Sequence, residues 1–182
     1  MAAYQGALLE PLPYEPYIET FSGEKFYFLN PTPEMIHIED IAHALANQCR
    51  FTGHSNKFYS VAEHSVRVAE LCENKLAGLL HDASEAYLTD VASPVKQYLS
   101  NYKELEDNIM KAIATKFDFP YPLDWSVHVA DKVLLAAEAD QLTASRGKDW
   151  PVRELFRNGI YLRCGTPAQA EVEFLAYFRG IV

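Results

Sequence analysis

The sequence has no run of about eighteen apolar residues, the length that an α-helix needs to cross a membrane. Its N-terminal stretch has neither a basic region nor a long apolar region, so we expect no signal peptide there. Cysteine is scarce as well. The three cysteines are widely spaced and form neither a disulfide framework nor a C-x-x-C zinc pattern. These absences predict a cytoplasmic protein with reduced thiols.

Positive charge is also in short supply. The chain has 16 Lys and Arg against 25 Asp and Glu, which gives a formal net charge of −9. Proteins that bind nucleic acids or anionic membranes in general need a positive field, so we expect neither partner. With 49% hydrophobic and 23% charged residues, the composition is that of an ordinary folded protein, and residues 1–182 can form a single domain.

The residue pattern predicts an all-α bundle with a minor β element. Three prolines among residues 1–16 indicate an irregular N-terminal arm. Aromatic and β-branched residues at 17–21 and 24–28 flank Ser22-Gly23, which predicts a small hairpin. Residues 146–166 are expected to be irregular. Apolar spacing at helical period predicts helices at about 38–49, 59–73, 75–87, 102–117, 124–145 and 167–178.

Four polar side chains occupy positions where these helices should bury apolar ones. His64 lies between two valines at helical spacing, the pair His81-Asp82 follows two leucines, and Asp131 shares a stripe with valine and leucine. Singly, each histidine is more often a hydrogen-bonded core residue, and Asp131 a salt-bridged one. A buried, unpaired carboxylate costs several kcal/mol, so two acids and two imidazoles facing one interior predict a shared cation. Mixed nitrogen and oxygen ligands favour a transition metal over calcium.

This combination resembles the HD-domain metal-dependent phosphohydrolases, whose signature is a His, a His-Asp pair and a later Asp. The matching segments here are SVAEHS, LLHDASEAY and VADKVLLAAEAD, together with a segment from Cys49 to Ser65 typical of compact phage and prophage members. The resemblance implies an HD-domain helical bundle with a small N-terminal β-hairpin, and a homo-oligomer. It also implies the cytoplasm of a bacterial host if the gene is carried by a phage. The implied ligands of the metal are His64, His81, Asp82 and Asp131.

The resemblance further implies the cofactor and the catalytic acids. The cofactor would be one divalent transition metal (zinc, cobalt or manganese), with further magnesium or manganese on the substrate phosphates. Glu85 lies one helical turn beyond His81, where a carboxylate can orient or deprotonate the attacking water. Asp90 can share or replace that role. The alternatives are a solvated helix residue for Glu85 and a loop or capping residue for Asp90.

Positive and aromatic residues near the motif suggest how a deoxynucleotide would bind. Arg50 and Lys96 are candidates for gripping phosphate oxygens, since both are cations within this motif set. The resemblance implies that Phe51 packs against the deoxyribose and leaves no room for a 2′-hydroxyl; the alternative is a packed core phenylalanine. Gly53 can permit a turn or leave space for the base. The remaining substrate-binding candidates, for further phosphates, are His54 and Lys57, with surface charge an equal alternative for the lysine.

The favoured interpretation is an enzyme that breaks the bond between the 5′ oxygen and the α-phosphorus of a 2′-deoxyribonucleotide. Cations beyond Arg50 and Lys96 favour a dATP-type triphosphohydrolase that releases triphosphate. The alternative is a 5′-deoxynucleotidase acting on deoxynucleoside monophosphates. A non-catalytic nucleotide-binding module ranks lower, because no ligand and no acid of the motif is missing.

Overall fold

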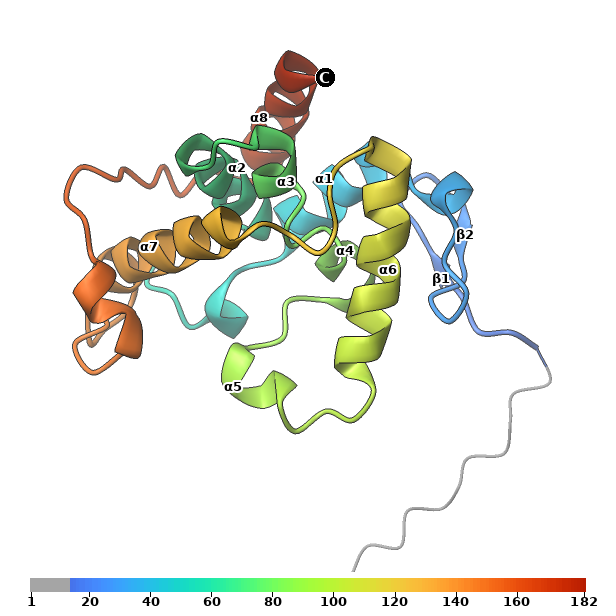
Figure 1. Cartoon of the computed structure of the whole chain (residues 1–182). Coiled ribbons are helices and arrows are strands. Elements are labelled where there is room, and N and C mark those ends of the chain that lie inside the picture. Colours follow the sequence, from blue (N-terminus) through green and yellow to red (C-terminus); the bar gives the residue numbers. More distant parts are fainter. Residues whose placement is uncertain (1–13) are drawn as a thin grey trace, which may run out of the picture.

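The computed structural model describes residues 14–182, which form a mainly helical structure with one small hairpin (Figure 1). In the hairpin, β1 (Ile18–Glu19) pairs antiparallel with β2 (Lys25–Phe26). The carboxylate of Asp40 accepts hydrogen bonds from the backbone N–H and the hydroxyl of Ser22, at 2.7 and 2.8 Å, and so ties the turn to the bundle. The expected hairpin is confirmed, with shorter strands. Most of the expected irregular arm at 1–16 lies outside the described residues.

Several helices begin at a residue whose side chain caps them. The hydroxyl of Ser60 accepts the backbone N–H of Glu63 at the start of the second helix, and Thr166 with Gln169 forms a capping box before the last one. Short 3-10 turns occur at Pro33–Met35, Phe51–Gly53 and Pro151–Leu155. The α-helices are α1 (Ile38–Asn47), α2 (Val61–Leu71), α3 (Lys75–Leu79), α4 (Glu85–Leu88), α5 (Ser93–Lys96), α6 (Tyr102–Phe117), α7 (Trp125–Leu142) and α8 (Pro167–Ile181).

The prediction of one continuous helix at 75–87 is wrong. The helix stops after Leu79, and turns over residues 80–84 separate α3 from α4. The backbone N–H of Glu85 donates to the carbonyl of Asp82 at 2.9 Å, a bond across three residues instead of four. His81 and Asp82 therefore lie on a turn rather than on the inner face of a helix. A short 3-10 turn at Pro151–Leu155 occurs within residues 146–166, where irregular chain was expected, and α5 forms between the helices expected at 75–87 and 102–117.

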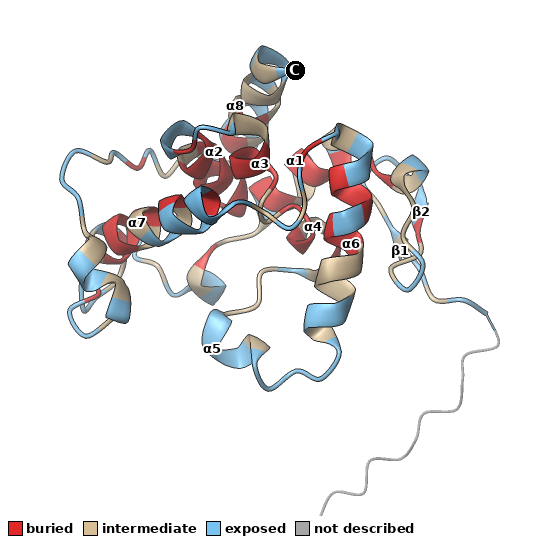
Figure 2. Ribbon diagram, in the orientation of Figure 1, coloured by how far each residue is buried: buried red, intermediate tan, exposed pale blue. Residues whose placement is uncertain are grey.

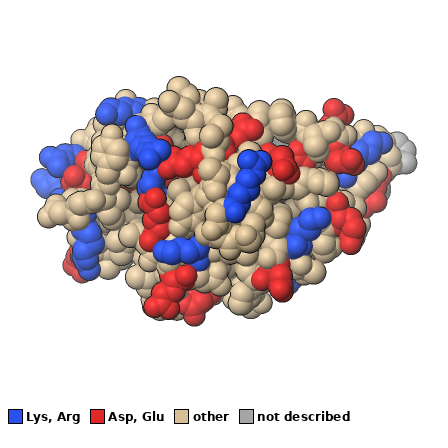
Figure 3. All heavy atoms as spheres, turned by 90° about the horizontal axis from the view of Figure 1, so that it is seen from above, with Lys and Arg blue, Asp and Glu red and all other residues tan. Residues whose placement is uncertain are grey.

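Helix α2 lies at the centre of the molecule. It packs against α1, α3, α7 and α8, and most of it is buried (Figure 2). Its buried residues include the polar Glu63 and His64. On the face shown in Figure 3, Lys and Arg are interspersed with Asp and Glu, without an extended field of one sign. No helix among residues 14–182 is long and apolar enough to span a bilayer.

A buried carboxylate attaches the last helix to this centre. Oε1 of Glu63 accepts the backbone N–H groups of Arg163 and Cys164, at 2.7 and 3.1 Å, and Oε2 accepts that of Gly165 at 3.1 Å. The loop that leads into α8 is thus held to α2 by three hydrogen bonds to one side chain.

Candidate metal centre

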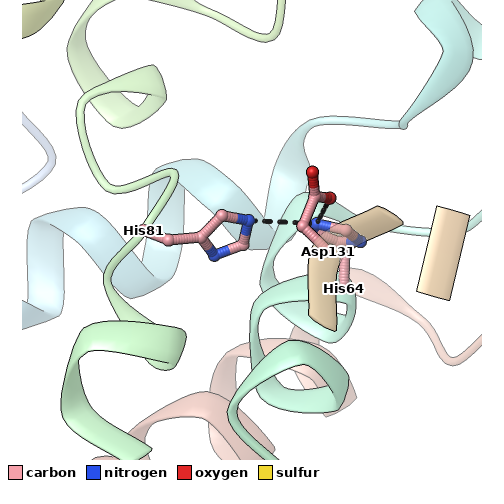
Figure 4. Close-up of side chains that lie close together, drawn as sticks. All are labelled: His64, His81 and Asp131. Carbon is pink, nitrogen blue, oxygen red and sulfur yellow. Dashed lines mark hydrogen bonds and ion pairs between the residues drawn. The ribbon is translucent and has the colours of Figure 1, made fainter. Parts of the chain in front are cut away.

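The four residues expected to bind a metal come from three parts of the fold and lie close together. His64 projects from α2, His81 and Asp82 from the turn between α3 and α4, and Asp131 from α7. Figure 4 shows the imidazole of His81 pointing toward His64 and Asp131. His64 is fully buried, whereas the side chains of Asp82 and Asp131 are 23% and 34% exposed. The cluster therefore opens to solvent on the side of the acids.

The separations between donor atoms fit a shared cation. Nε2 of His64 lies 3.2 Å from Nε2 of His81, 3.5 Å from Oδ2 of Asp82 and 3.3 Å from Oδ1 of Asp131. Nε2 of His81 lies 3.1 Å from the same Asp82 oxygen. Ligands held at about 2.1 Å from one ion, at tetrahedral or octahedral angles, are themselves about 3.0 to 3.4 Å apart. The two imidazole nitrogens and their nearest carboxylate oxygens therefore have separations close to those in a coordination sphere, and the donor atoms of His64, His81 and Asp131 all lie within 4.8 Å of one another.

Hydrogen bonds on the far side of both rings set which nitrogen faces the cluster. Nδ1 of His64 lies 2.7 Å from Oε1 of Glu138, and Nδ1 of His81 lies 2.8 Å from the carbonyl oxygen of Gly78. Each acceptor requires a proton on Nδ1, so each neutral ring presents the lone pair of Nε2 to its neighbours. Two lone pairs 3.2 Å apart repel each other unless a proton or a cation lies between them.

Gly78 helps to bring His81 into place. A Cβ atom at this position would lie 2.9 Å from the Cα of Ala69 in α2, closer than side-chain carbons come to backbone. Because glycine lacks that atom, α3 can approach α2 closely, and the carbonyl of Gly78 reaches the ring of His81.

Glu138 is one residue of the site that sequence reasoning missed. It is fully buried in α7, and its Oε2 lies 3.1 Å from Nη2 of Arg50. Burial alone would raise the pKa of Glu138, but Arg50 and His64 outweigh it and hold the pKa below its usual value. The signal was present, since Glu138 follows Asp131 by seven residues and therefore lies two turns along the same helix face.

The acids around His64 favour positive charge at the centre of the cluster. Burial and the charge of Arg50 both lower the pKa of His64, but Glu138 and Asp131 outweigh them and raise it to about 9. The pKa of Asp82 is held far below its usual value, because the nearby His81, His64 and Arg50 outweigh its burial. Protons or a metal ion can supply this charge.

The two expected catalytic acids lie beside the cluster. Glu85 is buried, and burial together with the charges of Asp82 and Asp90 raises its pKa to about 9. The pKa of Asp90 is also raised, chiefly by burial. Gln48 at the end of α1 connects the two. Its amide nitrogen donates to the carbonyl of Glu85 at 2.9 Å, and its amide oxygen accepts the backbone N–H of Asp90 at 2.8 Å. Nothing in the sequence pattern identified Gln48.

The two cations expected to bind phosphate, Arg50 and Lys96, are both paired with acids. The guanidinium of Arg50 is buried, forms an ion pair with Glu138 and lies 3.8 Å from Oδ2 of Asp82. Nζ of Lys96 lies 3.0 Å from Oε1 of Glu85 and 2.8 Å from Oε1 of Glu106. Each cation is within reach of the site, but neither is a free surface charge.

The remaining candidates lie in the loop after Arg50. Phe51 has a φ of 57°, rare for a bulky residue, and its ring lies 5.9 Å from that of Trp150 and 5.6 Å from the guanidinium carbon of Arg50. Gly53 has a φ of 77°, so it permits the turn, and a Cβ there would meet no atom within 4 Å. His54 and Lys57 are exposed. No hydrogen bond or ion pair joins their side chains to the cluster within residues 14–182.

No model of a known protein family matches the chain. Its sequence is 41% identical over 140 residues to the uncharacterized protein YfdR of Escherichia coli K12, which covers 76% of this chain and 79% of the relative. The chain belongs to the YfdR family. A second uncharacterized relative, from Rhodobacter capsulatus, is 37% identical over 179 residues. The match covers 85% of this chain and 90% of the relative. Neither relative brings an assigned activity, so the geometry of the site carries the functional proposal.

Proposed function

We propose that this member of the YfdR family is a metal-dependent phosphohydrolase of the HD type that acts on 2′-deoxyribonucleotides. The observation that carries the proposal is the cluster of His64, His81 and Asp131, whose donor atoms all lie within 4.8 Å of one another, with Oδ2 of Asp82 at 3.5 and 3.1 Å from the two Nε2 atoms. The residues fit such an ion because both imidazoles are oriented by acceptors behind them, and the two partly exposed acids beside them can supply negative charge to it.

The donor set narrows the choice of ion. Two imidazole nitrogens and two carboxylate oxygens suit zinc, cobalt or manganese, whereas calcium prefers oxygen ligands alone. When bound, such an ion would act as a Lewis acid that neutralises phosphate oxygens and lowers the pKa of water.

The protein's own residues would then supply orientation and proton transfer. Glu85 and Asp90, which lie near Asp82, would hold a water molecule and accept its proton as the water attacks the phosphorus. Arg50, buried between Glu138 and Asp82, would fix the ligand acids and offer its remaining donors to a phosphate oxygen. Phe51, held in its strained conformation beside Trp150, would face the sugar.

Two substrates share the bond between the 5′ oxygen and the α-phosphorus. The favoured candidate is a deoxynucleoside triphosphate of the dATP type, whose further phosphates would need His54 and Lys57 in addition to Arg50 and Lys96. The second candidate is a deoxynucleoside monophosphate. The pairing of Lys96 with two carboxylates favours this second substrate, because it leaves less free positive charge for a triphosphate.

A substrate screen tests the proposal directly. The purified chain, loaded in turn with cobalt, manganese, zinc or magnesium, is offered deoxynucleoside monophosphates, deoxynucleoside triphosphates and ribonucleoside triphosphates. Phosphate, pyrophosphate and triphosphate are quantified separately. Release of triphosphate identifies the first candidate, and release of phosphate from monophosphates identifies the second. A protein that retains no transition metal and releases none of these products would be a binding module, and the proposal would be wrong.

A further inference from the structure

We propose that Glu106 of α6 is a positioning residue that acts through Lys96 on Glu85. The inference deepens the proposed function, on which it rests. It starts from a chain of two contacts: Nζ of Lys96 donates to Oε1 of Glu106 at 2.8 Å and to Oε1 of Glu85 at 3.0 Å. One ammonium group thus joins an acid beside the cluster to an acid on a helix outside it.

Lys96 cannot be held in place by packing of its own helix. Helix α5 has four residues, none of which is buried, and it lies on a loop at the edge of the molecule (Figure 2). The position of its lysine must therefore come from contacts made by the side chain itself. The two carboxylates provide them, and the ring of Tyr102 lies beneath the ammonium at 5.4 Å.

Helix α6, in contrast, is firmly anchored. Ile109, Met110 and Ile113 follow Glu106 at spacings of three, four and seven residues, on the same helix face, and all three belong to the hydrophobic core. At the start of α6, the hydroxyl of Tyr102 donates to the carbonyl of Thr89 at 2.9 Å and fixes the other end of the loop that carries α5. Glu106 is thus the rigid partner, and Lys96 the adjustable one.

The contact with Lys96 distinguishes the two oxygens of Glu85. Oε1 accepts a hydrogen bond from the ammonium group of Lys96, whereas Oε2 is buried and has no hydrogen-bond partner among the described residues. A carboxylate held through one oxygen has little freedom to rotate, so Oε2 is the atom left to hold a water molecule. In this arrangement Lys96 orients Glu85, and Glu106 keeps Lys96 from turning away to solvent.

This role differs from phosphate binding by Lys96. A lysine that grips substrate contributes to its affinity, so its removal raises KM. A lysine that orients a catalytic acid contributes to the chemical step, so its removal lowers kcat. Substitution of Glu106 distinguishes the two roles of Lys96 as well. If Lys96 binds phosphate, the carboxylate of Glu106 competes with the substrate, and its removal should lower KM. If Lys96 orients Glu85, Glu106 supports that orientation, and its removal should lower kcat.

A double-mutant cycle on the full-length, manganese-loaded protein tests the inference. The variants are Glu106→Gln, Lys96→Met and the two combined, with Glu104→Gln, an exposed acid on the same helix, as the matched control. We expect Glu106→Gln and Lys96→Met each to lower kcat by about 10- to 100-fold, with KM within about twofold and metal content unchanged. Glu106→Gln should have no further effect once Lys96 is methionine.

Two results would overturn the inference: a raised KM with intact kcat in Lys96→Met, or additive effects of the two substitutions. Crystal structures of the unaltered protein and of Glu106→Gln give a second readout that needs no turnover. Lys96 should remain against Glu85 in the first and turn away in the second. If the unaltered protein hydrolyses no nucleotide, the proposed function fails, while these structures still decide whether Glu106 positions Lys96. An unmoved Lys96 would refute the inference.

Discussion

Glu138 contacts His64 through one carboxylate oxygen and Arg50 through the other, at 2.7 and 3.1 Å. A single buried acid therefore orients an expected metal ligand and neutralises the guanidinium beside it. Arg50 in turn approaches Asp82, a second expected ligand. The cluster and the residues behind it form one connected network. A substitution of Glu138 should therefore change the affinity of the cluster for the expected ion.

Replacing Glu138 should weaken metal binding. Glu138→Gln removes the charge that fixes the ring of His64, and we expect metal affinity to fall by about 10- to 100-fold. Glu138→Ala, which leaves a buried guanidinium without its partner, should lower the free energy of unfolding by about 3 to 5 kcal/mol. Chelator competition and urea denaturation measure the two effects, with the exposed Glu154→Gln as control. Unchanged affinity in Glu138→Gln would remove Glu138 from the site.

The same residue should make stability depend on pH. The pKa of Glu138 is lower in the folded protein than its ordinary value of 4.5, so the unfolded chain takes up its proton first as the pH falls. Its contribution to stability is therefore complete above about pH 5 and is lost as the pH drops toward the folded pKa. We expect the urea midpoint of the chelator-treated protein to fall with acid below pH 5, and less steeply in Glu138→Gln. Parallel pH profiles for the two proteins would contradict this assignment.

Removing an expected ligand should abolish metal binding and activity together. In His81→Ala or Asp82→Ala the cluster keeps at most three donors, so we expect the variants to be purified with little metal and to show no measurable turnover. His128→Ala, an exposed histidine one turn before Asp131 on α7, is the matched control and should retain both. Metal analysis and product release decide the matter. Full turnover by a variant that holds no metal would exclude the proposed mechanism.

Replacing Glu85 should lower the rate of hydrolysis without changing the metal content. Its carboxylate lies beside the cluster, bound to Lys96, so Glu85→Ala should keep the metal content and lose activity by about 100-fold or more. Metal content and kcat are measured on the same preparation. If the rate is unchanged, the role of base moves to Asp90, and Asp90→Asn should then show the loss.

The longer helices could be predicted because apolar spacing at helical period continues over ten or more residues. The break between α3 and α4 could not. Leu79, Leu80, Ala83 and Tyr87 continue the apolar spacing of a helix through the turn, and all four are buried. A continuous helix and a turn would bury these four side chains equally well, so the apolar pattern does not distinguish the two. The turn is selected by contacts of the folded protein, such as the one between the carbonyl of Gly78 and the ring of His81.

The convergent cluster was predictable for a different reason from the residues that support it. His64 and Asp131 stand out as polar groups on apolar helix faces, which a single sequence can reveal. Gln48, just after α1, contacts Glu85 from 37 residues away, and Glu106 contacts Lys96 from the next helix, ten residues on; nothing in their own surroundings marks either residue. Only the folded arrangement shows those contacts.

The three hydrogen bonds from residues 163–165 to Glu63 make the C-terminal helix part of the scaffold of the site, because Glu63 precedes His64 directly. A protease that nicks the exposed stretch around residues 157–159 should therefore leave two fragments that stay associated and elute as one species. A chain truncated before residue 163 would instead leave a buried carboxylate without its donors, right beside an expected metal ligand, and should be recovered mainly as aggregate.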